Sequence, residues 1–142
     1  MVDEEVVTTK LRQINEYTAD LREMRGPSKP AYLDDTILQR AVERTLMNVI
    51  RACIDLAQHI RATEDLSPSG TSKAEIEALG NAGVLSEGTV RKLQEAVGFR
   101  NILTHRYGTV DHDVVYDVLS EDVHWFEQFQ QEIAQWMRQR AS

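Results

Sequence analysis

The stretch LDDTILQRAVERTLMNVIRACIDLAQHIRATE, residues 33–64, decides the fold of this chain. Its apolar residues return every three or four positions, which is the spacing of one face of an α-helix. They are Leu38, Ala41, Val42, Leu46, Val49, Ile50, Cys53, Leu56, Ala57 and Ile60. The stretch therefore predicts a helix from about Leu33 to Glu64, long enough to span a domain.

The same periodicity precedes this stretch. It predicts a first helix over residues 4–24, with one apolar face made by Val7, Leu11, Ile14 and Leu21. Gly26, Pro27 and Pro30 should end that helix, because glycine and proline interrupt helical backbone.

A short third helix is expected after the break at residues 67–70. Ser72 and Glu75 have the spacing of a capping box, in which each side chain satisfies a backbone N–H at the helix start. Gly80 and Gly83 should close this helix.

Two further helical segments complete the chain. Ser86 should cap a fourth helix that ends near Gly108, and Asp111 or Asp113 should start another helix, which Ser120 restarts. The final apolar face consists of Phe126, Phe129, Ile133, Trp136 and Met137. No strand pattern occurs, so we expect an all-α bundle of four main helices plus one or two short helices, forming a single domain over residues 1–142.

Composition indicates the class of protein and its cellular compartment. Apolar residues make up 42% of the chain and charged residues 27%, as in ordinary soluble domains. The lone Cys53 lies on an apolar helical face, which favours a core residue in a reducing compartment. The acidic start and the lack of an apolar run near 20 residues predict a cytoplasmic protein with no signal peptide and no membrane contact.

The chemistry-bearing residues gather at the end of the fourth predicted helix, in FRNILTHRY, residues 99–107. Arg100 continues the apolar face of Leu93 and Val97, so its guanidinium needs a partner or a cleft. His105 follows about 140° around and about 7.5 Å along an ideal helix. Arg100 and His105 therefore converge only if the helix unwinds near Thr104 or if two copies of the helix face each other.

Charge gives a mixed indication of an RNA partner. The net charge of −7 opposes phosphate binding, but residues 86–107 are net positive. The charges there are Arg91, Lys92, Arg100 and Arg106 against Glu87 and Glu95. A solvated helix face with mixed charges is the simpler interpretation of the same pattern.

The spacing of Arg100, His105 and Tyr107 resembles the signature of the HEPN superfamily, in which four to six residues separate Arg from His. The tyrosine narrows the resemblance to HepT-like proteins, and residues 39–44 and 55–60 also look like their long helix. This resemblance covers residues 33–118. It implies an HEPN-like bundle, a homodimer, and an endoribonuclease toxin paired with an MntA-like nucleotidyltransferase antitoxin.

The residue types suit RNA cleavage without a metal ion or other cofactor. His105 could transfer a proton near neutral pH, and Arg100 could stabilise the charge that develops on the phosphate. Asn101 could orient the phosphate or the histidine. The competing interpretations are a histidine that stabilises a helix C-terminus and an arginine in a surface ion pair.

Tyr107 should lie just past the helix end, near His105. Taken alone it is an ordinary capping aromatic residue. The resemblance implies instead that it accepts adenylyl groups, and the added negative charge would neutralise Arg100 and repel RNA.

Other interpretations remain open from the sequence. The chain could be a noncatalytic or nucleotide-binding partner of a nucleotidyltransferase, or a plain dimeric bundle. Arg51, Asp55 and His59 share one helix face. Asp55 and His59 could ligate a metal ion, but no third ligand is evident, so we expect a structural or interface network and no metal site.

Overall fold

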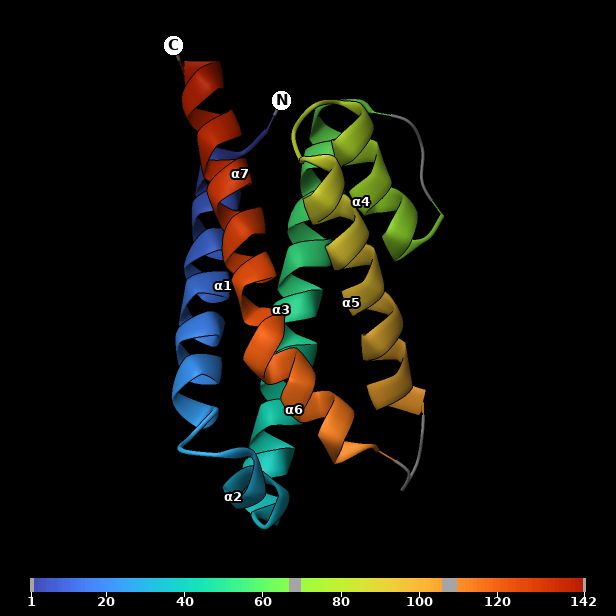
Figure 1. The fold of residues 1–142 in the computed structure, drawn as a ribbon. Coiled ribbons are helices and arrows are strands. Elements are labelled where there is room, and N and C mark those ends of the chain that lie inside the picture. Colours follow the sequence, from blue (N-terminus) through green and yellow to red (C-terminus); the bar gives the residue numbers. More distant parts are fainter. Residues whose placement is uncertain (1, 67–69, 106–109, 142) are drawn as a thin grey trace.

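A computed structural model of the protein describes residues 2–66, 70–105 and 110–141, without the side chains of Thr104, His105 and Ala141. The described residues form helices and no strand, and the helices are α1 (Glu4–Met24), α2 (Lys29–Leu33), α3 (Thr36–Thr63), α4 (Ser72–Asn81), α5 (Glu87–His105), α6 (His112–Glu121) and α7 (Val123–Ala141). The long helices α1, α3, α5 and α7 run along the molecule, and the shorter ones join or flank them (Figure 1). The predicted all-α bundle is confirmed.

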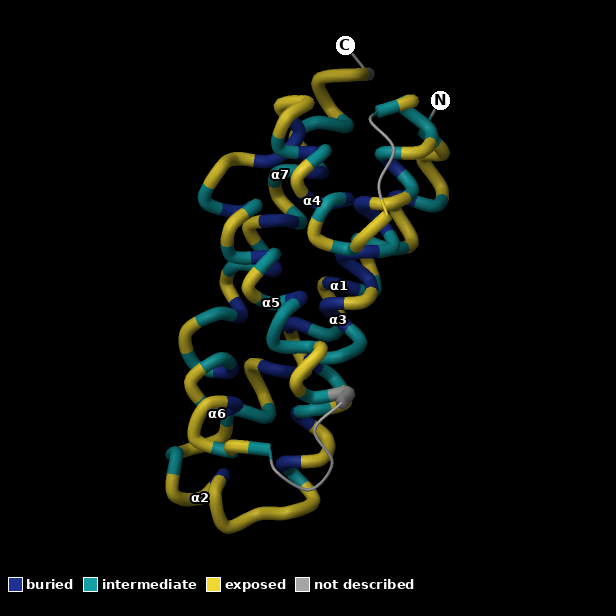
Figure 2. The backbone as a smooth tube through the Cα atoms, turned by 90° about the vertical axis from the view of Figure 1, so that its right-hand side faces the viewer, coloured by how far each residue is buried: buried dark blue, intermediate teal, exposed yellow. Residues whose placement is uncertain are grey.

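Helix α3 is the centre of the bundle. It packs against every other helix that the structure describes, and Figure 1 shows it between the α1–α7 pair and the α4–α5 pair. The apolar face predicted from the sequence is buried, with Leu46, Ile50 and Leu56 fully inaccessible, whereas Ala41 is exposed. Buried positions follow the inside of each long helix (Figure 2).

The start of α3 differs from the prediction. Asp35 caps it by accepting a hydrogen bond from the Leu38 N–H at 3.0 Å, so the helix begins at Thr36. The preceding residues form α2, which was not predicted because Pro30 was interpreted as a helix breaker. Pro30 lies in the first turn of α2, where its missing N–H costs no intrahelical bond, and Ser28 caps that turn. Helix α1 has the predicted bounds.

Helix α4 also corrects two local predictions. Its N-cap is Thr71, whose hydroxyl accepts from the Ala74 N–H at 3.1 Å, while Ser72 is the first helical residue. The Glu75 carboxylate does not return to the cap but is buried against Arg61 of α3. Gly83 closes the helix with a φ of 78°, as expected for a glycine at this position.

Gly80 has a packing role instead of a terminating one. It lies inside α4, and a Cβ there would come within 2.7 Å of the Val90 side chain on α5. Its missing side chain lets α4 and α5 approach closely, which fixes the position of α5.

The start of α5 is hydrogen-bonded to a side chain of α7. Ser86 caps α5 by accepting from the Thr89 N–H at 3.4 Å, and the Ser86 N–H donates to Glu132 at 2.7 Å. Asp111 caps α6, as predicted. Ser120 does not restart that helix, because the break occurs at Asp122, where the chain turns into α7.

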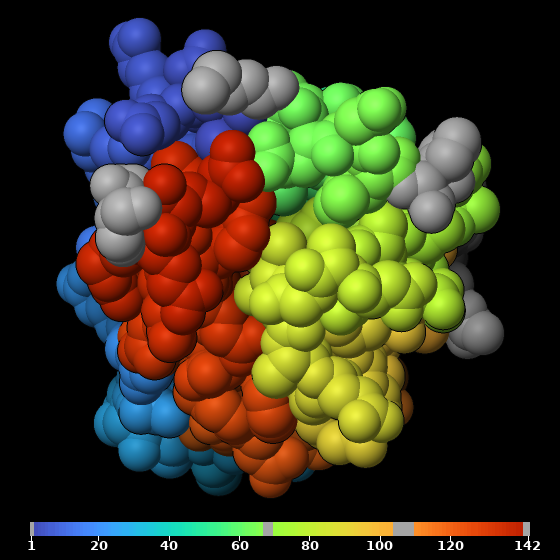
Figure 3. Space-filling view, turned by 90° about the horizontal axis from the view of Figure 1, so that it is seen from above, coloured from blue at the N-terminus to red at the C-terminus, as the bar shows by residue number. Residues whose placement is uncertain are grey.

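Both termini gather at one end of the bundle, with the end of α3 and the α4–α5 connection (Figure 3). The C-terminal end of α5 lies in the other half of the molecule (Figure 1). The predicted stop at Gly108 falls outside the described residues. Within the ranges described, no helix has both the length and the apolarity needed to cross a bilayer.

Candidate active-site groove

The structure places the predicted site residues at the end of α5. Arg100 and Asn101 lie in its last turns, and His105 is its final residue. The side chain of His105 and all of Tyr107 fall outside the described part of the chain.

Arg100 occupies a boundary between core and surface. On the same face of α5, Leu93 and Val97 are almost fully buried, with exposed fractions of 1% and 2%. Arg100 is only partly buried, and its Nη2 donates to the Asn101 Oδ1 at 3.3 Å. The expectation that this guanidinium needs a partner or a cleft is confirmed.

The cleft is an open groove of about 510 Å³ between α3 and α5. Its walls come from three helices and comprise Arg44, Met47, Asn48, Arg51, Ile54 and Asp55 of α3, Ser72 of α4, and Arg100 and Asn101 of α5. We call this set of residues the α3–α5 groove. Polar side chains dominate it, which suits a charged, hydrated ligand better than an apolar one.

The α3–α5 groove carries positive charge in an acidic protein. Arg44, Arg51 and Arg100 contribute three guanidinium groups, and Asp55 is the one acidic residue in the wall. The Asp55 carboxylate faces Lys10 of α1 at 3.5 Å, which offsets its charge. The groove can therefore attract an anion despite the net charge of −7.

Arg44 and Asn48 line the groove but are not among the residues that the sequence motif predicts for the site. Arg44, Asn48 and Arg51 follow one another at helical spacing, so they share a face of α3. That polar face was visible in the sequence, but its position opposite Arg100 depends on how α3 packs against α5.

Asp55 and His59 have structural partners. The Asp3 N–H donates to the His59 Nε2 at 3.2 Å, and Asp55 pairs with Lys10. Both contacts tie α3 to the start of α1, in line with the structural network expected from the sequence. Across residues 2–66, 70–105 and 110–141, no three His, Cys, Asp or Glu side chains gather in a way that could hold a metal ion.

Cys53 is a core residue, as predicted. It is fully buried in α3, and burial raises the pKa of its thiol far above the ordinary value. A protonated, inaccessible thiol is not a nucleophile.

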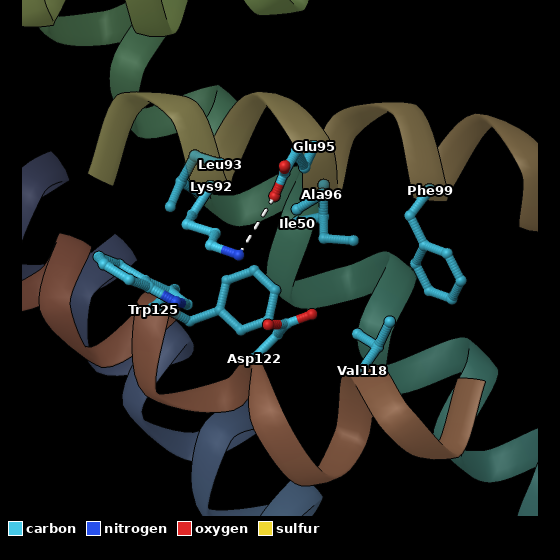
Figure 4. A pocket seen from close by; sticks show the side chains of 10 residues that line it. Ile50, Lys92, Leu93, Glu95, Ala96, Phe99, Val118, Asp122 and Trp125 are labelled. Atoms are coloured by element: carbon cyan, nitrogen blue, oxygen red, sulfur yellow. Dashed lines mark ion pairs between the residues drawn. The ribbon is translucent and has the colours of Figure 1, made fainter. Parts of the chain in front are cut away.

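A second, smaller hollow of about 140 Å³ lies between α5 and the α6–α7 junction. Figure 4 shows Phe99, Val118 and Trp125 around it, and an ion pair between Lys92 and Glu95 at 3.5 Å. Burial raises the pKa of Asp122 at its edge. Its walls are mainly apolar and do not include Arg100 or Asn101, so this hollow is separate from the predicted chemistry.

The end of α5 also carries an apolar surface. Ile102 is 47% exposed and Val114 of α6 is 46% exposed. Phe99, Leu103 and Val115 lie with them around one shallow depression. Exposed aliphatic side chains that cluster in this way are typical of a protein contact surface.

Two known proteins are similar to this chain over most of its length. The chain is 26% identical over 125 residues to the mRNA nuclease HepT of Shewanella oneidensis, covering 88% of this chain and 93% of that protein. It is 27% identical over 115 residues to the tRNA nuclease HepT of Aphanizomenon flos-aquae, covering 81% of this chain and 78% of that protein.

A solved structure shares the fold. The tri-AMPylated Shewanella oneidensis HEPN toxin in complex with MNT antitoxin superposes with a TM-score of 0.85 at 27% identity, covering 94% of this chain and 98% of the toxin. The model of the family Ribonuclease HepT-like matches residues 14–133, which include α3, α5 and the Arg100–His105 segment. The resemblance seen in the sequence is confirmed, and the chain belongs to the Ribonuclease HepT-like family.

Proposed function

We propose that this chain is a metal-independent endoribonuclease toxin, silenced when a nucleotidyltransferase antitoxin adenylylates Tyr107. The observation that carries the proposal is the position of Arg100 and Asn101 in a basic groove. The nuclease relatives support RNA as the substrate. The AMPylated Shewanella toxin with its MNT antitoxin supports this mode of control.

The proposed reaction is transfer of a phosphodiester within RNA. His105 removes the proton of a ribose 2′-hydroxyl, whose oxygen then attacks the adjacent phosphorus. The bond from phosphorus to the 5′-oxygen breaks, and that oxygen takes up the proton that His105 removed, which returns the imidazole to its neutral form. The products are a 2′,3′-cyclic phosphate and a 5′-hydroxyl end.

Arg100 and Asn101 have supporting electrostatic and orienting roles in this step. The guanidinium of Arg100 stabilises the negative charge on the phosphorane oxygens. Because the Oδ1 of Asn101 accepts from Arg100, its amide N–H groups remain as donors for a phosphate.

The site is completed by a second copy of the chain. Helix α5 continues through His105 and does not unwind near Thr104. Arg100 and His105 are therefore offset by about 140°, and one copy of α5 directs them to different sides. A homodimer in which the two copies of α5 face each other would place two Arg100 and two His105 residues around one composite cleft.

We assign residues 1–142 to one HepT-like domain that acts in the cytoplasm. The helices that extend beyond the family match, α1 and α7, both pack on α3. The buried, reduced Cys53 fits a reducing compartment.

The direct test compares Arg100→Ala and His105→Ala with the purified wild-type protein on a single-stranded RNA. His105→Ala removes the base and should lower kcat about 10²- to 10⁴-fold. Arg100→Ala removes the cation and should lower kcat about 10²- to 10³-fold. Arg12→Gln on the exposed face of α1 is a charge-changing control and should keep full activity. Unchanged cleavage in both test variants would contradict the assignment of catalysis to Arg100 and His105. No cleavage by the wild-type protein would leave only a noncatalytic or nucleotide-binding role.

A further inference from the structure

We propose that Arg44 and Arg51 of α3 are RNA-positioning residues that bind phosphates of the strand beside the bond being cleaved. This inference rests on the proposed nuclease function and extends it to residues outside the Arg100–Tyr107 motif. The two arginines touch the substrate backbone and not the reacting atoms.

The geometry of α3 brings these side chains to the site. Arg44, Asn48 and Arg51 lie within about 60° of one another on an ideal helix, and the two arginines are about 10 Å apart along its axis. All three line the α3–α5 groove opposite Arg100 and Asn101. The groove therefore presents a row of donors on one wall and the motif residues on the other.

The charges of Arg44 and Arg51 are available for a ligand. Both side chains are exposed, and among the described residues neither forms an ion pair. Other arginines of this protein do pair, as Arg61 does with Glu75 and Arg140 with Glu64. Two uncompensated guanidinium groups in one groove repel each other, and a bound polyanion relieves that repulsion.

The occupant that fits best is a single RNA strand. A backbone-tracking groove for single strands combines an open channel with several cations, and arginine binds phosphate through paired N–H donors. The α3–α5 groove is open, polar and continuous with Arg100. A folded protein partner would need more apolar contact than the groove walls offer.

Binding to an RNA that cannot be cleaved tests the inference without relying on catalysis. The probe is a fluorescent 2′-O-methyl oligonucleotide, and the readout is fluorescence anisotropy. Arg44→Gln and Arg51→Gln should each weaken binding about fivefold, and the double variant about 25-fold if the contacts are independent. Each substitution should also reduce the slope of log affinity against log salt by about 0.7.

Cleavage kinetics separate positioning from folding. The single variants should raise KM while changing kcat less than about twofold, since a lost phosphate contact weakens binding of the substrate and of the transition state equally. Arg44→Lys and Arg51→Lys should restore most of the affinity, because the charge returns. Arg12→Gln removes one charge outside the groove and should change neither the affinity nor KM.

The outcomes distinguish the two proposals. Wild-type protein that binds the probe through Arg44 and Arg51 but does not cleave RNA would remove the proposed nuclease activity and keep the groove as an RNA site. Unchanged probe binding in the double variant would overturn this inference, even if cleavage depends on Arg100 and His105. Weaker association with the antitoxin and unchanged probe binding would also overturn it, by identifying the groove as a protein surface.

Discussion

The Nη2 of Arg100 donates to the Oδ1 of Asn101 across 3.3 Å, although the two residues are consecutive on α5. Consecutive helical residues do not normally face each other, because each step turns about 100°. The contact means that both side chains are drawn towards the α3–α5 groove, whose wall includes both. The pair places a cation and an amide side by side in the groove wall.

This relationship predicts a measurable role for Asn101. Asn101→Ala should lower kcat/KM about tenfold or more, since a hydrogen bond to a charged group contributes roughly 1.5–3 kcal/mol. The value of kcat/KM is measured from steady-state cleavage of a short RNA. Asn15→Ala, on the exposed face of α1, is the matched control and should match wild type. Equal activity in the two variants would show that Arg100 does not need its neighbour.

Cleavage should need no divalent metal ion. His105 and Arg100 supply the proton transfer and the charge stabilisation of the proposed reaction, so a chelator should leave the rate unchanged. Mass spectrometry of the products should identify 2′,3′-cyclic phosphate ends. Activity that appears only after magnesium or manganese is added would contradict the mechanism.

Tyr107 should be the site of control and not of catalysis. Tyr107→Phe should keep most of the nuclease activity and remain toxic in cells that also produce the nucleotidyltransferase. An adenylyl group on Tyr107 would place phosphate charge beside Arg100 and repel the RNA backbone. Intact-mass measurement after incubation with the partner and ATP is the test. An equal mass gain on wild type and Tyr107→Phe would locate the acceptor elsewhere.

Glu132 should stabilise the fold in a pH-dependent way. Burial raises the pKa of its carboxyl group, but hydrogen bonds from Thr89, Ser86 and Gln128 outweigh that effect and hold the pKa below 4.5. Glu132→Gln should therefore reduce the free energy of unfolding at pH 7 by on the order of 2 kcal/mol.

The sign of the pH dependence follows from the lowered pKa. The carboxylate contributes its full stability above the unfolded-state value of 4.5. That contribution is lost as the pH falls through the lower folded-state value. Urea unfolding at pH 7 and pH 3 should show a difference between wild type and Glu132→Gln that shrinks at pH 3. A difference of the same size at both values would exclude an ionised Glu132 as its source.

The fold was predictable where local signals are strong. The bounds of α1 and the apolar face of α3 follow from periodicity, because burying one face against the core requires it. Helix α2 is not evident from the sequence, because a proline can either begin or end a helix. Only the structure shows that Pro30 lies at the beginning of one. Thr71 was missed as a cap because the adjacent Ser72 offers an equivalent hydroxyl and only the backbone conformation distinguishes them.

The lining of the α3–α5 groove was predictable in part. Arg100 and Asn101 stand out in the sequence because the motif is local to one helix, and both line the groove. Arg44 and Asn48 do not, since no spacing along the chain relates them to Arg100. Their proximity depends on the α3–α5 packing, which includes the close approach of Gly80 to Val90.

In the proposed dimer, one catalytic cleft uses Arg100 from one copy and His105 from the other, and a mixed dimer is the decisive test of this arrangement. Arg100→Ala and His105→Ala chains carrying different tags are produced together, and the mixed dimer is purified through both tags and assayed on RNA. We expect cleavage well above that of either variant alone, because one intact Arg100–His105 pair remains across the interface. A verified mixed dimer as inactive as the two parent variants would contradict the composite cleft.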